Sequence, residues 1–273
     1  MAKLKKITQA CDYHRFIDEA GDMTFFGKGK SCVLGQTGVS KVFILGMTAY
    51  KEPLFQAREK IIEFCQTTAN DPYFNTMPSV AKRINQGGFY LHAKDDPAEL
   101  RYKFLTFMVS ELDFSSQAIV GRKDLDRFVR KHHSREREFY ADLLSHLLKD
   151  KANYPKLVVN IAQRGSCTQG KNLSDALQQT HARYHSQKGG KYKAAIKFNV
   201  QPYDKEPLLT VIDYSLWAIQ RVFQRGEDRH YQLIKDKISL VFDLYDVAKA
   251  GKENCWGNCY TPKNPLSREN KID

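Results

Sequence analysis

Short apolar runs alternate with polar segments along the chain, and these runs have the length of β-strands. Residues 42–49 are apolar on both faces, which is typical of a central strand covered by helices. In the first run, the apolar residues Phe16 and Ile17 precede Asp18, where the run ends. The predicted strands span residues 13–18, 23–26, 42–49, 88–93, 116–121, 156–162 and 195–200.

Longer segments carry apolar residues at helical spacing. The predicted helices span residues 53–65, 98–112, 136–148, 172–184, 207–223 and 231–248. Asp96 and Pro97 are expected to be the N-cap and the first residue of the second helix. Residues 67–87 are predicted to be irregular and residues 249–273 a loose tail. Strands followed by alternating strands and helices predict an α/β or α+β sheet with helices on its faces.

An acidic cluster follows the first predicted strand. Asp18, Glu19 and Asp22 lie within five residues, and Gly21 precedes the last of them. Acids are poor strand formers, and crowded like charges repel, so a positive partner is expected. Carboxylate oxygens bind hard divalent cations, whereas Asp and Gly are also common in turns. The residues alone leave a metal site and a plain turn open.

A second carboxylate lies on the predicted helix 207–223. Asp213 is one residue away from the apolar stripe of that helix. A buried acid is costly unless it has a partner. The expected partner is either an arginine such as Arg221 or a metal ion that Asp213 shares with Asp18.

The chain is basic overall. It has 43 Lys and Arg against 31 Asp and Glu, which gives a net charge of +12. A basic surface favours polyanions, with nucleic acid as the leading class of partner. A concentrated acidic cluster in a basic protein suits a metal-dependent enzyme acting on phosphodiesters. In such an enzyme, positive surface holds the backbone and a negative pocket holds the metal.

Several other classes lack their sequence signals. The chain has no Walker loop, no GxSxG elbow and no dinucleotide-binding glycine fingerprint, so covalent nucleophile chemistry has no support. No signal peptide and no apolar run of the ~18 residues of a membrane span are present. The six cysteines form no dense framework, and Cys255 and Cys259 lack a second pair of zinc ligands. These features predict a cytoplasmic protein with reduced thiols and no membrane partner.

Short motifs resemble those of the DUF3800 family. The segment FIDEAGD at 16–22 resembles the (F/Y)IDESG opening of that family, and VIDYSLWA at 211–218 resembles its (A)DliA helix. The apolar run that ends near His92, Lys123 after the strand 116–121, and Arg164 after the strand 156–162 match further landmarks. The similarity covers residues 13–245.

The resemblance carries implications for fold and site, because the family is regarded as ribonuclease H-like. It implies an α/β fold with a mixed central sheet flanked by helices over residues 1–250, followed by a C-terminal tail, 251–273. Asp18 and Asp213 would hold a divalent metal, with Glu19 and Asp22 near the site. The residues expected to bind a substrate phosphate are His92, Lys123 and Arg164. The alternatives are a metal position or a solvated charge for Lys123, a solvated charge for Arg164 and a structural histidine for His92.

The predicted function is metal-dependent hydrolysis of nucleic-acid phosphodiester bonds with Mg²⁺ or Mn²⁺. The alternatives are a non-catalytic module that binds nucleic acid or protein, and a metal-dependent phosphatase. Ribonuclease H delivers a further acid where this chain has Arg122 and Lys123, which favours the module. A long basic groove leading to the acids would favour the nuclease, and a closed pocket the phosphatase. The residues favour neither DNA nor RNA and indicate no oligomeric state.

Overall fold

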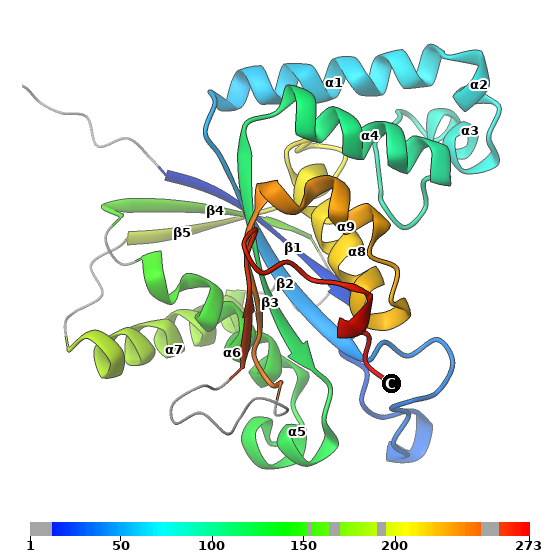
Figure 1. Cartoon of the computed structure of the whole chain (residues 1–273). Helices are drawn as coiled ribbons and strands as arrows, with labels where there is room; N and C mark the ends of the chain where they lie inside the picture. The colour runs from blue at the N-terminus through cyan, green and yellow to red at the C-terminus, as the bar shows by residue number, and fades with distance from the viewer. Residues whose placement is uncertain (1–12, 152–153, 164–169, 190–194, 247–256) are drawn as a thin grey trace, which may run out of the picture.

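A mixed β-sheet forms the centre of the fold (Figure 1). The computed structural model describes residues 13–151, 154–163, 170–189, 195–246 and 257–273. Among these residues the sheet has seven strands in the order β5-β4-β1-β2-β3-β6-β7. The strands are β1 (Tyr13–Gly21), β2 (Val42–Tyr50), β3 (Phe114–Arg122), β4 (Lys156–Ala162), β5 (Ala195–Gln201), β6 (Ile238–Asp243) and β7 (Asn258–Tyr260).

The pairing of the strands identifies the fold class. Strands β1, β2 and β3 form an antiparallel meander. Strand β4 pairs in parallel with β1, and β5 pairs in parallel with β4. This mixed sheet flanked by helices is the ribonuclease H-like arrangement, so the predicted fold class is confirmed. Strand β6 adds a parallel neighbour to β3, and β7 pairs antiparallel with β6.

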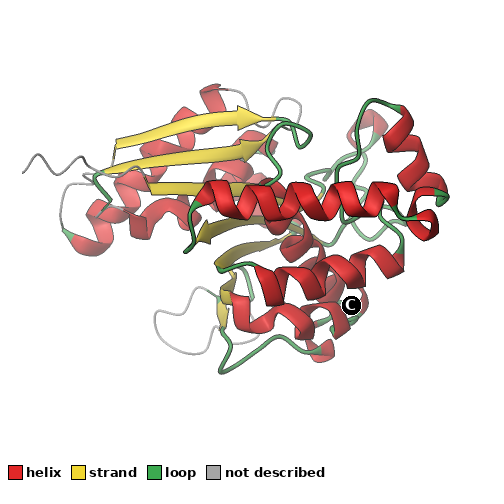
Figure 2. Ribbon diagram, turned by 90° about the horizontal axis from the view of Figure 1, so that it is seen from above, coloured by secondary structure: helices red, strands yellow, loops and turns green. Residues whose placement is uncertain are grey.

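Helices cover both faces of the sheet (Figure 1; Figure 2). One core contains residues of α1, α4, α8 and α9, and the other contains residues of α5, α6 and α7. Alternation along β1 places Phe16 in the first core and Ile17 in the second. The helices are α1 (Leu54–Asn70), α2 (Pro72–Asn75), α3 (Pro78–Asn85), α4 (Ala98–Glu111), α5 (Leu125–His132), α6 (Glu136–Leu148), α7 (Gly170–Lys188), α8 (Leu209–Arg225) and α9 (Arg229–Ile234).

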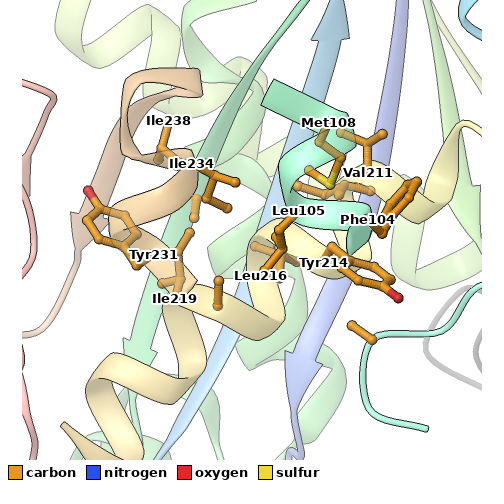
Figure 3. Packing of buried hydrophobic residues seen from close by; sticks show 14 of the residues in the cluster. Phe104, Leu105, Met108, Val211, Tyr214, Leu216, Ile219, Tyr231, Ile234 and Ile238 are labelled. Atoms are coloured by element: carbon orange, nitrogen blue, oxygen red, sulfur yellow. The ribbon is translucent and has the colours of Figure 1, made fainter. Parts of the chain in front are cut away.

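Helix α8 is the most buried helix on its face of the sheet. Figure 3 shows its apolar residues between α4 on one side and α9 on the other. Tyr214 and Phe104 pack with their ring centroids 4.6 Å apart. The stripe predicted from the sequence is therefore the core-facing side of α8, and its buried length fixes the direction of the helix across the sheet.

Gly46 of β2 allows α8 to lie close to the sheet. A Cβ atom at this position would lie 2.9 Å from Cδ1 of Ile212 and even closer to Leu216. Gly46 is also the residue that pairs with Asp18 across β1 and β2. The close approach of the helix therefore occurs beside Asp18, and it brings Asp213, the residue after Ile212, to the same place.

Two predicted strands are absent from the described residues. Residues 23–26 contribute a single bridge, between Phe26 and Cys32, because the chain turns back on itself there. Residues 88–93 form a loop, although Leu91 and Ala93 are buried. The amides of His92 and Ala93 donate to the carboxylates of Asp96 and Asp213 instead of to a neighbouring strand.

Other parts of the chain are more regular than predicted. Residues 67–87 continue α1 and then form α2 and α3, each of which has a proline in its first turn. The predicted helix 231–248 ends early, and α9 is followed by β6, whose run ISLVFD pairs with β3. Residues 257–273 are not loose where described, because they form β7 and bury Leu266. Pro97, not Asp96, is the N-cap of α4.

Two further expectations concern membrane-spanning helices and free cysteines. Among the described residues, every helix is too short or too polar to cross a membrane. Cys32, Cys65 and Cys259 are free thiols. Cys255 lies outside the described residues, so the expectation that Cys255 and Cys259 form no zinc site stays a prediction.

Replacing Gly46 with Ala tests the close approach of α8. The added methyl group would overlap the side chains of Leu216 and Ile212. Overpacking of this kind costs about 1–3 kcal/mol, so the midpoint of urea unfolding should fall. An unchanged midpoint would show that α8 does not depend on the missing side chain.

Candidate active site

Asp18 lies on β1, on the face of the sheet that α8 covers. Its side chain is buried, and one carboxylate oxygen accepts a hydrogen bond from the hydroxyl of Tyr203. The position follows from the alternation of β1, since Phe16 two residues earlier belongs to the core beneath α8. Asp18 is therefore an acid at the boundary between that core and a cavity.

Asp213 projects from α8 toward the same cavity. Its Oδ2 accepts a hydrogen bond of 2.8 Å from the amide of Ala93. Burial raises the pKa of Asp213 to about 7, and the charges of Asp96 and Asp95 act in the same direction. The alternative partner considered from the sequence, Arg221, pairs with Glu227 at 2.6 Å instead. Asp213 forms no ion pair with the residues that the structure describes.

Tyr203 is the residue that brings the acids into one group. It lies between β5 and α8, and its hydroxyl donates to Asp18. Burial raises the pKa of Tyr203 strongly, and the negative charges of Asp18, Asp213 and Glu19 raise it further. The hydroxyl therefore contacts one carboxylate and is affected by the charges of two more. Nothing in the sequence marks Tyr203, because its role depends on how the connection after β5 folds.

One cavity joins most of the predicted site residues. It has a volume of about 730 Å³. Five predicted residues line it: Asp18, Glu19, Asp22, His92 and Asp213. Tyr203, Lys94 and Gln163 also line it near the acids, and the outward face of α8 continues it. Arg164 lies outside the described residues, so its predicted role stays a prediction.

The loop 88–97 carries His92 and the Ala93 amide to the site. Asp96 anchors this loop, because its buried carboxylate accepts hydrogen bonds from the His92 amide at 2.9 Å and from Tyr214 and Arg83. The ring of His92 lies 5.7 Å from that of Tyr203, centroid to centroid. Asp96 therefore acts on the site by holding the loop in place.

Asp22 and Lys123 form an ion pair at the end of β1. Lys123 Nζ lies 2.9 Å from Asp22 Oδ1, and the Lys123 side chain is 0% exposed. The amides of Ser40 and Thr24 also donate to Asp22, at 2.6 and 2.9 Å. These contacts fold the loop between β1 and β2. Lys123 lines a neighbouring cavity, and the carboxylate of Asp22 faces backbone amides.

The cavity offers two buried carboxylates to a divalent cation. Within the described ranges, no three His, Cys, Asp or Glu side chains are grouped closely enough to hold a metal ion. Two carboxylates, Asp18 and Asp213, do line one cavity, and Mg²⁺ is commonly held by one or two carboxylates together with waters and substrate phosphates. The hard oxygen donors and the buried negative charge therefore fit such a cation.

Comparisons with known proteins add little to this picture. No protein-family model matches the chain, and no curated protein matches it. A chain in the structure of the PCNA:RNase HII complex from Archaeoglobus fulgidus is 8% identical, with a TM-score of 0.40. That alignment covers 82% of this chain and 77% of that chain. The likeness is too low to support an argument, so the fold rests on the sheet order, and the resemblance to DUF3800 stays a prediction.

The ion pair at Asp22 predicts a pH dependence of stability. Burial raises the pKa of Asp22, but hydrogen bonds from Ser40 and the contact with Lys123 outweigh it and lower the pKa from 3.8 to about 2. The folded protein thus binds this proton less readily than the unfolded chain. The resulting stability is present above pH 3.8 and is lost as the pH falls toward about 2.

Urea unfolding at several pH values between about 5 and 2 measures this loss. The Asp22→Asn variant should lose less stability over the window than the unmodified protein. Asp126→Asn, which changes an exposed acid, should behave like the unmodified protein. Equal losses in all three proteins would show that Asp22 does not carry the effect.

Proposed function

We propose that the protein is a metal-dependent nuclease that hydrolyses nucleic-acid phosphodiester bonds. Asp18 and Asp213 hold Mg²⁺ or Mn²⁺, and the nucleic acid lies in the cavity that these acids line. The observation that carries the proposal is the shape of this cavity. It is not confined to the acids but continues along the outward face of α8.

Polar and cationic side chains occupy that face of α8. Counted from Asp213, they follow at helical spacing along one side of the helix. The lining residues there are Trp217, Gln220, Arg221, Gln224 and Arg225. Among the described residues, Gln224 Nε2 is buried without a hydrogen-bond partner. The exposed Arg225 and Lys94 would offset the charge of a backbone phosphate in this part of the cavity.

Trp217 positions two of the neighbouring cations. The guanidinium groups of Arg101 and Arg221 lie 4.8 and 5.4 Å from its ring centroid. These contacts are typical cation–π distances. Arg101 also donates to the carbonyl oxygen of Ala93 at 3.1 Å, which links the α8 face to the loop that carries His92. Arg101 thus connects the cationic face of α8 to the loop beside the acids.

Each group has a part in the proposed reaction. Asp18 and Asp213 supply the carboxylate oxygens, and the Ala93 amide holds Asp213 in place. When bound, the metal polarises the phosphoryl oxygen and lowers the pKa of water. Lys94 and Arg225 hold the flanking phosphates, and His92 contacts the reacting one. Glu19, buried in the same wall, adds negative charge near the water.

A non-catalytic nucleic-acid-binding module is the second candidate. It is favoured by one observation, namely that the described residues bring together no group of three metal ligands. In that case the cationic face of α8 would bind the backbone, and the acids would be structural. A phosphatase acting on a small substrate fits less well, because its substrate would leave the α8 face of the cavity unused.

Removal of either acid tests the nuclease directly. Asp18→Asn and Asp213→Asn should each weaken Mn²⁺ binding, measured by calorimetry, and reduce cleavage of labelled nucleic acid more than about 100-fold. Loss of groups that only orient metal ligands already costs about 10–100-fold. Asp204→Asn is the matched control, since Asp204 is exposed beside Tyr203. Cleavage that survives in both site variants would place the chemistry elsewhere.

A charge reversal tests the α8 face. Arg225→Glu should weaken nucleic-acid binding for all sequences and reduce the slope of log affinity against log salt by about 1. Arg130→Glu is the control, because Arg130 is an exposed cation of α5 on the other side of the sheet. Equal effects from the two variants would mean that only net charge matters.

A further inference from the structure

A row of amide side chains lies on β4 and β5. Asn160 of β4 pairs with Asn199 of β5. Ala162 pairs with Gln201 and belongs to the core beneath α8, whereas Phe198 packs against the core on the other face of the sheet. Alternation along β5 therefore places Asn199 and Gln201 on the same side of the sheet as α8.

Asn160 holds the two outer amides in place. It is 3% exposed, and its Oδ1 accepts hydrogen bonds from Asn199 Nδ2 at 3.0 Å and from Gln201 Nε2 at 3.3 Å. Its own Nδ2 donates to the Arg15 carbonyl oxygen at 3.4 Å. Each outer amide uses one N–H on Asn160, which leaves its oxygen and its second N–H for a ligand. The two amides therefore present donors and acceptors in fixed positions.

This side of β5 is open among the residues that the structure describes. Lys197 and Asn199 are exposed, and within those residues no part of β5 belongs to the core beneath α8. Strand β5 lies at one edge of the sheet, beyond β1 and β4 (Figure 1). Lys197 adds a positive charge to the open surface, which suits a polyanion.

The amide row adjoins the cavity of the candidate active site. The backbone amide of Gln163, just after β4, donates to the Gln201 carbonyl oxygen at 2.9 Å. Gln163 lines the cavity, and so does Tyr203, two residues after Gln201. A strand of nucleic acid that crosses the acids can therefore pass from the cavity onto β4 and β5.

We propose that unpaired bases of the nucleic acid lie on this face of the sheet. Asn199 and Gln201 contact the bases, and Lys197 contacts the backbone. The inference rests on the proposed function, because it takes the neighbouring cavity as the place of cleavage. It assigns a substrate that has a single-stranded segment beside the cleaved bond.

The arrangement of the amides favours unpaired bases over a duplex. A side-chain amide offers a donor and an acceptor together, and this pair matches N6 and N7 of adenine. The major groove of a duplex admits a helix or a two-stranded ribbon, whereas these amides lie on the face of a wider sheet. Single-stranded segments, whose bases can be splayed out, are able to reach such a face.

The experiment measures binding of short labelled oligo(dA) and oligo(dT) strands to the full chain by fluorescence anisotropy, without reference to activity. The unmodified protein should bind oligo(dA) about fivefold more tightly than oligo(dT), or better, as expected for bidentate amide contacts. A double variant, Asn199→Ala with Gln201→Ala, should lose this preference. Its binding of a dA·dT duplex should be unchanged, because paired bases do not reach the amides.

A second variant leaves the hydrogen bonds of Asn160 intact. Lys197→Glu should weaken binding of both single strands equally and reduce the slope of log affinity against log salt by about 0.7. Lys263→Glu is the matched control, because Lys263 is an exposed cation after β7, at the other edge of the sheet. Its binding of both strands should match that of the unmodified protein.

The outcomes separate this inference from the proposed function. A preference for oligo(dA) that survives in the double variant, or that the unmodified protein lacks, would overturn the base contacts. Weaker duplex binding by the double variant would overturn the single-stranded assignment, and equal effects of the two lysine variants would overturn the path over β5. In each case the proposed function stands if cleavage depends on Asp18 and Asp213. If the unmodified protein binds none of these nucleic acids, both fail.

Discussion

Burial of several carboxylates in one place is the constraint on which the rest of the site depends. Asp18 and Asp213 are both buried, and their charges both act on Tyr203. Buried like charges are unfavourable unless donors or cations offset them. In this protein the offset comes from the Tyr203 hydroxyl and the Ala93 amide. A divalent cation would offset both charges at once, which is the physical basis of the proposed function.

The surrounding fold serves to bring the two acids together. Gly46 lets α8 lie on the sheet beside Asp18, and the buried stripe of α8 then sets the position of Asp213. Asp96 fixes the loop that supplies the Ala93 amide, while Asp22 and Lys123 close the end of β1. These supporting polar groups have hydrogen-bond or ionic partners of their own. The site is therefore assembled from acids that differ in task, even though they look alike in the sequence.

The sequence predicts the parts of the site that depend on local pattern. Asp18 follows from a short strand with an acid at its end, and Asp213 follows from an acid beside an apolar helical stripe. Tyr203 and the Ala93 amide could not be found this way, because their roles arise only when distant segments meet. The run 88–93 has the composition of a strand, yet two carboxylates replace the neighbouring strand as hydrogen-bond acceptors. In residues 231–248, a short apolar run is compatible with either a strand or a helix. It forms strand β6 because it pairs with β3.

The proposed function requires Asp18 and Asp213 to hold one cation between them. Anomalous diffraction from a crystal grown with Mn²⁺ locates the metal without any assumption about activity. The proposed site predicts an anomalous peak at about 2.0–2.1 Å from a carboxylate oxygen of each residue. A peak at another site, or none at these carboxylates at saturating Mn²⁺, would contradict it.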